Sequence, residues 1–413
     1  MAYLAGHHLR AMRRGNWKGY RSRGVEALFY LSAPLAALVT TPYLARALGP
    51  ADRGLLGVGL AVASVAVMMG ALGQAETYLS NFRQGEDSYR TAVLIARVCG
   101  IVAGFLAFAT MVGLGLPISV AILLSLWVPL LGEANIWRSA AIGRSNTNRP
   151  ALANAIASLI RLILIPTLAI LSVLSLEVAA SLMQGALFVG SLLAMGLYAT
   201  RVGPHASSRA SLESTRAAAK SGLRFVLFGA ITAITLRSDV IVMQVFSSPT
   251  EVGTYAAAIA LAQSGLALSG YFRGRAQVAI ISSEPLRGVV RETAGLLMCG
   301  ALAVVVVIAA AEPIADVLFG PEYLDAAVIL RVVALAAVGQ MLLDLVQGLL
   351  IVQGQSRQLV IIAGVGASIA LIGLFALVPV WAGIGAAVAV SVATIGASSI
   401  GLVILLRSLR TAG

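Results

Sequence analysis

The chain has 413 residues, of which 59% are hydrophobic and only 11% are charged, and its formal net charge is +12. Its mean hydropathy is +0.93, whereas about a quarter of the residues of soluble domains are charged, so the composition excludes an ordinary water-soluble domain. The positive charge is scattered over many short polar segments, which also excludes a basic domain that binds nucleic acid. The sequence therefore predicts an all-α polytopic membrane protein.

The first 24 residues are predicted to form a basic tail. They contain six Arg and Lys residues before any long apolar run, and no small-residue cleavage site follows the first apolar stretch. Anionic lipids of the inner leaflet attract such a segment by roughly 1 kcal/mol per basic residue. We therefore expect a retained tail on the cytoplasmic side.

About twelve apolar stretches follow, each long enough to cross the roughly 30 Å of hydrocarbon in a bilayer. Short polar segments, most of them with Arg, separate these stretches. The predicted spans cover residues 28–48, 55–80, 91–113, 117–137, 151–172 and 178–200 in the first half, and 223–246, 253–272, 289–311, 326–352, 359–379 and 383–406 in the second.

The distribution of basic residues predicts the orientation of these spans. Most of the 29 Lys and Arg residues fall in segments that would be cytoplasmic if the N-terminus is inside, whereas the outer loops hold only Arg46 and Arg53. Cytoplasmic loops of membrane proteins carry an excess of Lys and Arg. We therefore predict a multi-pass protein of the inner (cytoplasmic) membrane with both termini in the cytoplasm.

The two halves of the chain resemble copies of one unit. Pro50-Ala-Asp-Arg-Gly54 follows the first predicted span, and Pro249-Thr-Glu-Val-Gly253 follows the seventh. A second echo, Gly143-Arg-Ser against Gly354-Gln-Ser, has an offset that also carries Glu133 onto Asp344. Two six-helix lobes around a central cavity would then be related by an axis along the membrane normal. The predicted division is a tail at 1–24, a lobe at 25–200, a link at 201–222 and a lobe at 223–413.

Charged residues near the middle of the spans are the first candidates for a substrate site. A charge at the centre of a transmembrane helix costs about 2.5 to 3.5 kcal/mol, so such side chains should face protein or water. Arg237 and Asp239 lie mid-way along the seventh predicted span and Arg161 along the fifth. Residues two apart in a helix point roughly 200° apart. We therefore predict that Arg237 faces the cavity as an anion contact and that Asp239 pairs with another helix.

The remaining charged candidates lie nearer the ends of their spans. Arg97 is a further possible substrate contact, although a side chain that reaches the cytoplasmic interface also explains its position. Glu76, Glu133 and Asp344 are candidates for ion coupling or gating. The interpretation that we favour for these three carboxylates is structural pairing with neighbouring arginines.

No catalytic or metal-binding motif is apparent in the sequence. A Gly-x-Ser-x-Gly elbow, a Walker loop and clustered metal ligands are all missing, and Cys99 and Cys299 lie singly in apolar runs. The three histidines are in polar segments, away from acidic or thiol partners. We therefore expect no enzyme activity, no cofactor and no metal.

Several stretches resemble one family of membrane proteins. Tyr43-Leu-Ala-Arg-Ala-Leu-Gly-Pro-Ala-Asp-Arg-Gly54 is similar to the first loop of the polysaccharide flippases in the multidrug/oligosaccharidyl-lipid/polysaccharide exporter superfamily. Arg237-Ser-Asp239 with Val252-Gly-Thr-Tyr255, Leu318-Phe-Gly-Pro-Glu-Tyr323 and Val378-Pro-Val-Trp-Ala-Gly-Ile-Gly-Ala-Ala387 also match recurrent phrases of that family. The resemblance covers nearly the whole chain.

The resemblance implies a transporter that works by alternating access. Such proteins pass a lipid-linked oligosaccharide, usually on undecaprenyl diphosphate, from the inner to the outer leaflet, and a glycan polymerase or glycosyltransferase would be a partner. Their cationic cavity maps here to Arg237 and Arg161. The first predicted span lacks the further charged residues of peptidoglycan-precursor flippases, which argues against that substrate.

Other functions stay open on the sequence alone. A drug or metabolite antiporter of the same superfamily would favour carboxylates over arginines in its cavity. A major-facilitator transporter would also have two six-span lobes, but the segment Asn81–Arg90 lacks the loop phrase of that family. A non-transporting scaffold for glycan-assembly enzymes is disfavoured by the buried charge in both halves.

Overall fold

A computed structural model describes residues 16–83, 89–144, 146–196, 212–264, 273–274, 277–278, 298, 300–302, 304–323 and 325–411. These residues form helices and short connections, without a strand. The elements are α2 (Asn16–Gly70), α3 (Gln74–Arg83), α4 (Tyr89–Gly113), α5 (Ile118–Gly143), α6 (Asn148–Ile170), α7 (Leu176–Ser191), the π-helix η1 (Leu192–Gly196), α9 (Leu212–Phe246), α10 (Pro249–Ser264), α13 (Ala311–Phe319), the 3-10 turn η3 (Pro321–Tyr323), α14 (Ala326–Val352) and α15 (Ser356–Thr411).

The helices agree with a polytopic membrane protein. Among the described residues, seven helices are long and apolar enough to cross a membrane, or up to nine if each of two bent pairs is one span. The longest two, α2 and α15, have 55 and 56 residues and break at Gly49 and Ala382, where the backbone leaves helical geometry. Both breaks lie between predicted spans, so α15 contains two of them, and α2 contains the first and the larger part of the second. About twelve spans are therefore consistent with the fold.

The second predicted span, 55–80, is wrong as one continuous helix. Its chain leaves helical geometry at Leu72 and Gly73, which both have positive φ, so that α2 ends and α3 begins around this point. A β-carbon on Gly73 would lie 2.7 Å from the β-carbon of Phe225 in α9. The break thus lets α9 pack directly on the backbone. The seventh predicted span also bends, by 49° between Phe225–Thr235 and Arg237–Phe246.

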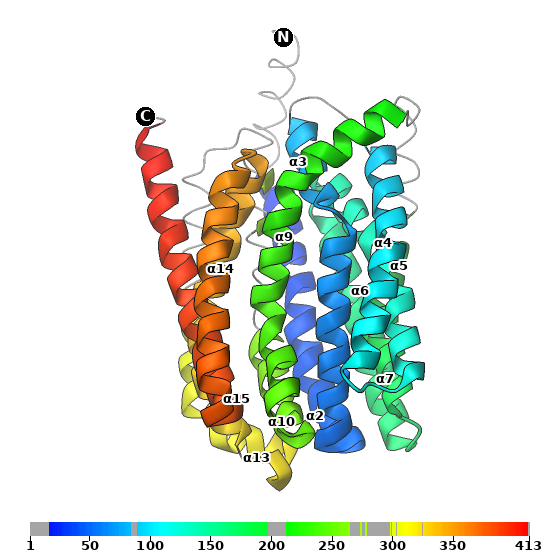
Figure 1. Ribbon diagram of the computed structural model, residues 1–413, viewed down its shortest axis with the longest axis vertical. Coiled ribbons are helices and arrows are strands. Elements are labelled where there is room, and N and C mark those ends of the chain that lie inside the picture. The colour runs from blue at the N-terminus through cyan, green and yellow to red at the C-terminus, as the bar shows by residue number, and fades with distance from the viewer. Residues whose placement is uncertain are drawn as a thin grey trace.

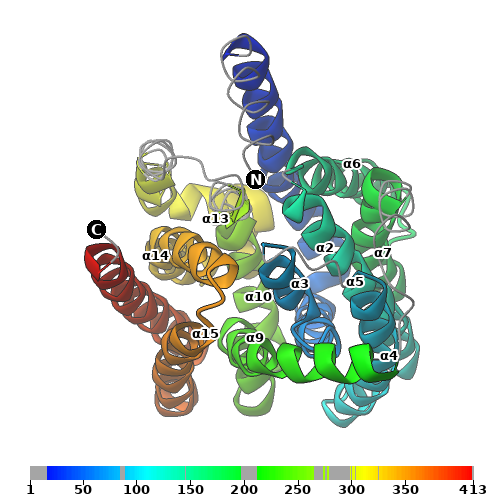
Figure 2. The ribbon, with the colours of Figure 1, turned by 90° about the horizontal axis from the view of Figure 1, so that it is seen from above.

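The helices stand side by side in one bundle (Figure 1). Seen along the bundle, α4 to α7 gather on one side and α13 to α15 on the other, with α2, α3, α9 and α10 between them (Figure 2). In Figure 1, α3 and the C-terminal end of α15 lie at the upper end, and α13 lies across the lower end. Residues 1–15 of the predicted tail, 201–211 of the predicted link and 289–297 of the span 289–311 lie outside the described residues.

One apolar core joins helices of both halves. Leu56 and Leu124 from the first half belong to the same buried cluster as Tyr255 and Leu330 from the second, and all four are fully buried. Burial of apolar side chains between helices in this way fixes how the two sets of helices meet.

The two echoed turns of the sequence meet each other in this interface. A β-carbon on Gly54 would lie 2.6 Å from the carbonyl oxygen of Pro249, and a β-carbon on Gly253 would overlap the carbonyl oxygen of Pro50. Each glycine therefore faces the proline that begins the other turn. This reciprocal contact is what a two-fold relation between the halves would produce, and it supports the predicted duplication.

Candidate functional site

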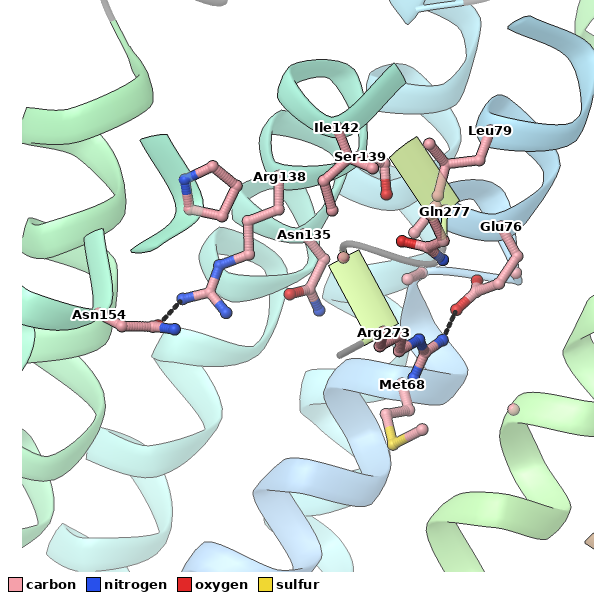
Figure 3. A pocket seen from close by; sticks show the side chains of 16 residues that line it. Met68, Glu76, Leu79, Asn135, Arg138, Ser139, Ile142, Asn154, Arg273 and Gln277 are labelled. Atoms are coloured by element: carbon pink, nitrogen blue, oxygen red, sulfur yellow. Dashed lines mark hydrogen bonds and ion pairs between the residues drawn. The ribbon is translucent and has the colours of Figure 1, made fainter. Parts of the chain in front are cut away.

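A cavity of about 300 Å³ lies between helices of the two halves, toward the end of the bundle where α3 lies. This volume is at the lower end of the range for ligand pockets. Its polar and charged lining comes from α5 and α6 on one side and from α3, Arg273 and Gln277 on the other (Figure 3). The lining includes Glu76, Asn135, Arg138, Ser139, Asn154, Arg273 and Gln277.

One wall of the cavity is a single face of α5. Asn135, Arg138, Ser139 and Ile142 are spaced three or four residues apart, so they project from the same side of the helix. The Nη2 of Arg138 donates a hydrogen bond of 3.0 Å to the Oδ1 of Asn154 in α6. The amide oxygen orients the guanidinium without neutralising its charge.

The facing wall contains an ion pair between the two halves. The Nη2 of Arg273 lies 3.6 Å from the Oε1 of Glu76 in α3, and the two side chains are 32% and 23% exposed. Arg273 can sit here because α14 has Gly348 beside it. A β-carbon on that glycine would lie 3.0 Å from the carbonyl oxygen of Arg273.

Arg161, predicted as a substrate contact, lies behind the cavity wall rather than on it. It follows Asn154 by seven residues, so it continues the same face of α6 toward the opposite end of the bundle. Its Nη2 donates a hydrogen bond to the carbonyl oxygen of Met183 in α7. The positive charge of Arg138 repels the positive charge of Arg161. The two guanidiniums together make this side of the cavity positive.

Arg237 and Asp239 are on α9 but do not belong to the described cavity lining. Arg237 begins the second part of the bent helix and is half-buried. Asp239 is buried, and the hydroxyl of Tyr255 in α10 donates a hydrogen bond of 2.6 Å to its Oδ2. The prediction that Asp239 pairs with another helix is confirmed.

The other predicted residues lie away from this cavity. Arg97 in α4 binds Glu133 in α5 through both forks, with Nε to Oε2 at 2.6 Å and Nη2 to Oε1 at 2.8 Å. The predicted pairing of carboxylates with arginines is thus confirmed for Glu133, and also for Glu76. Asp344 instead accepts a hydrogen bond of 3.3 Å from the Nε2 of Gln340 within α14. A role of Arg97, Glu133 or Asp344 in transport stays a prediction.

The opposite end of the interface is closed by hydrogen bonds between the halves. Arg46 donates to the carbonyl oxygen of Val317 at 2.6 Å, and the hydroxyl of Tyr323 donates to the carbonyl oxygen of Ala45 at 3.1 Å. The Nη2 of the buried Arg53 donates to the carbonyl oxygen of Ala256 at 3.3 Å. These contacts join the halves at the end where α13 lies, opposite the cavity at the α3 end.

Sequence reasoning missed the two arginines that line the cavity. It placed Arg138 and Arg273 in cytoplasmic loops because the apolar runs end at 137 and 272. The structure corrects this, since α5 continues to Gly143 and residues 273–274 are helical. The spacing of Asn135, Arg138 and Ser139 was a signal of a polar helix face. Within the described ranges, no group of three or more His, Cys, Asp and Glu residues could hold a metal ion.

A sequence model of the family described as "Polysaccharide biosynthesis protein" matches residues 21–281, more than half of the chain. The chain belongs to this family. A comparison with curated proteins gives no match. The family agrees with the resemblance drawn from the loop motifs. The matched residues 21–281 include most of the first half and the cavity residues Arg138 and Arg273.

The fold of this family member is similar to solved transporter structures. The lipid II flippase MurJ in an inward closed conformation aligns with a TM-score of 0.66 and 11% identity, over 92% of this chain and 87% of that one. A transporter of the MOP superfamily from Pyrococcus furiosus gives 0.62 and 13%, with 95% of each chain covered. A variant of the Vibrio cholerae MATE transporter VcmN gives 0.61 and 15%, over 95% and 96%. The polysaccharide biosynthesis protein is thus an all-α, multi-pass membrane protein with the MOP transporter fold, as predicted.

Proposed function

We propose that this protein is a flippase that moves a lipid-linked saccharide from the inner to the outer leaflet for polysaccharide biosynthesis. The carrier would be a prenyl diphosphate such as undecaprenyl diphosphate. One observation carries the proposal: Arg138 and Arg273, one from each half, line a single cavity between the halves. The family and the fold are consistent with it.

Two arginines in one cavity suit a diphosphate. A guanidinium holds phosphate oxygens with two parallel hydrogen bonds and keeps its charge at any physiological pH. A diphosphate head bound by Arg138 and Arg273 would bridge the two halves, while the prenyl tail stays in lipid. The amides of Asn135, Asn154 and Gln277 can donate to and accept from the sugar hydroxyls.

Alternating access would follow from the arrangement of contacts at the two ends. The cavity faces the predicted cytoplasmic side, and the hydrogen bonds from Arg46, Arg53 and Tyr323 close the predicted outer side. Rocking of the halves would break these bonds and expose the bound head outward. Each such bond contributes only about 0.5 to 1.5 kcal/mol, so these three bonds add little to the cost of separating the buried apolar side chains of the two halves.

The remaining predicted residues are proposed to act around this pair. Arg161 would raise the positive potential behind Arg138. Arg237 stays a candidate anion contact because it begins the second part of the bent α9, whose bend would change as the halves rock. The protein would lie in the inner membrane with both termini in the cytoplasm. A glycan polymerase or glycosyltransferase that uses the exported glycan would be its partner.

The competing functions fit the cavity less well. A drug or metabolite antiporter would need carboxylates that face the substrate. Among the described residues that line the cavity, Glu76 is the one carboxylate, and it is paired with Arg273. A scaffold has no need of a charged cavity between its halves.

The test is the accumulation of lipid-linked saccharides in cells that lack the protein. These cells are complemented with the wild type, Arg138→Ala, Arg273→Ala, Arg237→Ala, or the control Arg90→Ala, which alters an exposed arginine of α4. Loss of one charge-assisted hydrogen bond of about 1.5 to 3 kcal/mol should lower transport by tenfold or more in the two cavity variants. Arg90→Ala should restore the wild-type pool. Unchanged pools in cells lacking the protein would contradict the proposal.

A further inference from the structure

The cavity already contains an anion, the carboxylate of Glu76. It lies beside the guanidinium that is proposed to bind a phosphate, and both side chains are partly exposed to the cavity. Figure 3 shows this pair on the wall opposite Arg138 and Asn154. A group with the charge of the ligand therefore lies beside Arg273.

The break in the second span places this carboxylate. Glu76 is in the first turn of α3, and α3 begins only because the chain turns at Leu72 and Gly73. A carboxylate in the first turn of a helix is favoured by the helix dipole. A continuous helix would not begin here, so the break gives Glu76 a stabilised place at the cavity wall.

The pair of Glu76 with Arg273 is much looser than the ion pair of Arg97 with Glu133. Arg97 and Glu133 make two contacts at 2.6 and 2.8 Å, within the range of charge-assisted hydrogen bonds. Glu76 and Arg273 make one contact at 3.6 Å, which is beyond hydrogen-bonding distance. Glu76 therefore attracts Arg273 by charge rather than by a hydrogen bond, and a phosphate that forms hydrogen bonds would bind this guanidinium more strongly.

We propose that Glu76 is a built-in competitor for the diphosphate of the substrate. It pairs with Arg273 before substrate binds and is displaced when a phosphate forms two hydrogen bonds with that guanidinium. This inference rests on the proposed function. Because Glu76 and Arg273 belong to different halves, displacement also breaks a tie between the halves at the cavity end. By the same competition, the return of Glu76 to Arg273 promotes release of the head group.

The test is direct binding of farnesyl diphosphate to the purified full-length protein in lipid nanodiscs, with farnesol as the ligand without phosphate. Glu76→Gln removes the competing charge and should tighten binding about two- to fivefold, the range that loss of an exposed ion pair corresponds to. The matched control is Glu312→Gln, which removes the carboxylate that pairs with Arg331 at 2.8 Å outside the cavity and should leave the affinity unchanged. Glu76→Asp, which keeps the charge on a shorter side chain, should give a smaller tightening and serves if Glu76→Gln does not fold.

The role of Arg273 is tested by a double substitution. In an Arg273→Gln background, binding is weaker and the addition of Glu76→Gln should have no further effect, because the two residues act on each other. Equal or weaker binding by both Glu76 variants, with a wild type that binds the diphosphate, overturns the competitor but leaves the flippase proposal intact. A wild type that binds farnesyl diphosphate no better than farnesol overturns the proposed substrate class itself.

Discussion

The hydroxyl of Tyr323 donates a hydrogen bond of 3.1 Å to the carbonyl oxygen of Ala45, and so ties the turn after α13 to α2 across 278 positions of the sequence. Tyr323 is 1% exposed and its ring packs on Phe319, with centroids 5.7 Å apart. This bond joins the halves at the end that would open for outward release in the proposed cycle. It is a point where closure can be weakened without changing the cavity.

Tyr323→Phe is expected to loosen this closed end. It removes one hydrogen bond of about 0.5 to 1.5 kcal/mol and keeps the ring in place. Hydrogen exchange of residues 311–323 should become faster, while exchange in α5 stays as in the wild type. Protection equal to that of the wild type would show that the bond does not hold the closed end.

The hydrogen bond from Tyr323 to Ala45 should persist at alkaline pH. Burial raises the pKa of the Tyr323 hydroxyl to about 12, against a smaller opposing effect of Arg53. Because the folded pKa lies above the unfolded value of about 10, the contribution to stability is complete below pH 10 and is lost as the pH rises through 12. The difference in tyrosinate absorbance between wild type and Tyr323→Phe should therefore titrate well above pH 10. A midpoint near 10 would contradict the buried position.

Gly54→Ala and Gly253→Ala should each destabilise the protein, because their β-carbons meet backbone atoms that cannot rotate away. Overpacking of this kind costs about 1 to 3 kcal/mol. The matched control is Gly113→Ala at the end of α4, where a β-carbon has no neighbour within 4 Å. Thermal unfolding in detergent measures the effect. Equal unfolding temperatures for all three variants would exclude the close contact of the two turns.

Tyr255→Phe should be costly because it leaves the buried carboxylate of Asp239 without its hydroxyl donor. A hydrogen bond to a charged group contributes about 1.5 to 3 kcal/mol. Tyr43→Phe, at an exposed tyrosine of α2, should change stability by no more than about 0.5 kcal/mol. In Asp239→Asn, the further change Tyr255→Phe should cost less than in the wild type, and equal costs would show that the two side chains do not interact.

The sequence predicted the elements that depend on long apolar runs and on charge placement. The turns at Gly49 and Ala382 fall between predicted spans, and Asp239 has the partner on another helix that its burial required. It did not predict the break at Leu72 and Gly73, because that break is stabilised by the packing of Phe225 from a distant helix. A local pattern cannot contain a contact of this kind.

The positions of the cavity arginines Arg138 and Arg273 also could not be predicted from local sequence patterns. Hydropathy ends a span where charge begins, so Arg138 was assigned to a loop, although a helix that borders a cavity continues through charged residues. Arg237 was favoured because it is central in its span, and its contact with an anion stays a prediction. Depth along a helix alone does not say which face a side chain occupies. The facing residues of α5 follow from its helical spacing, whereas their meeting with Arg273 required the fold.

The contact of Gly54 and Gly253 with the opposite prolines has a consequence for repeated cycles of transport. It is made by backbone against backbone, with no side chain that must change rotamer when the surfaces part or rejoin. Such a contact can re-form in the same geometry because it does not require side chains to adopt particular rotamers. We therefore expect this contact to disfavour closure of the halves in a wrong register.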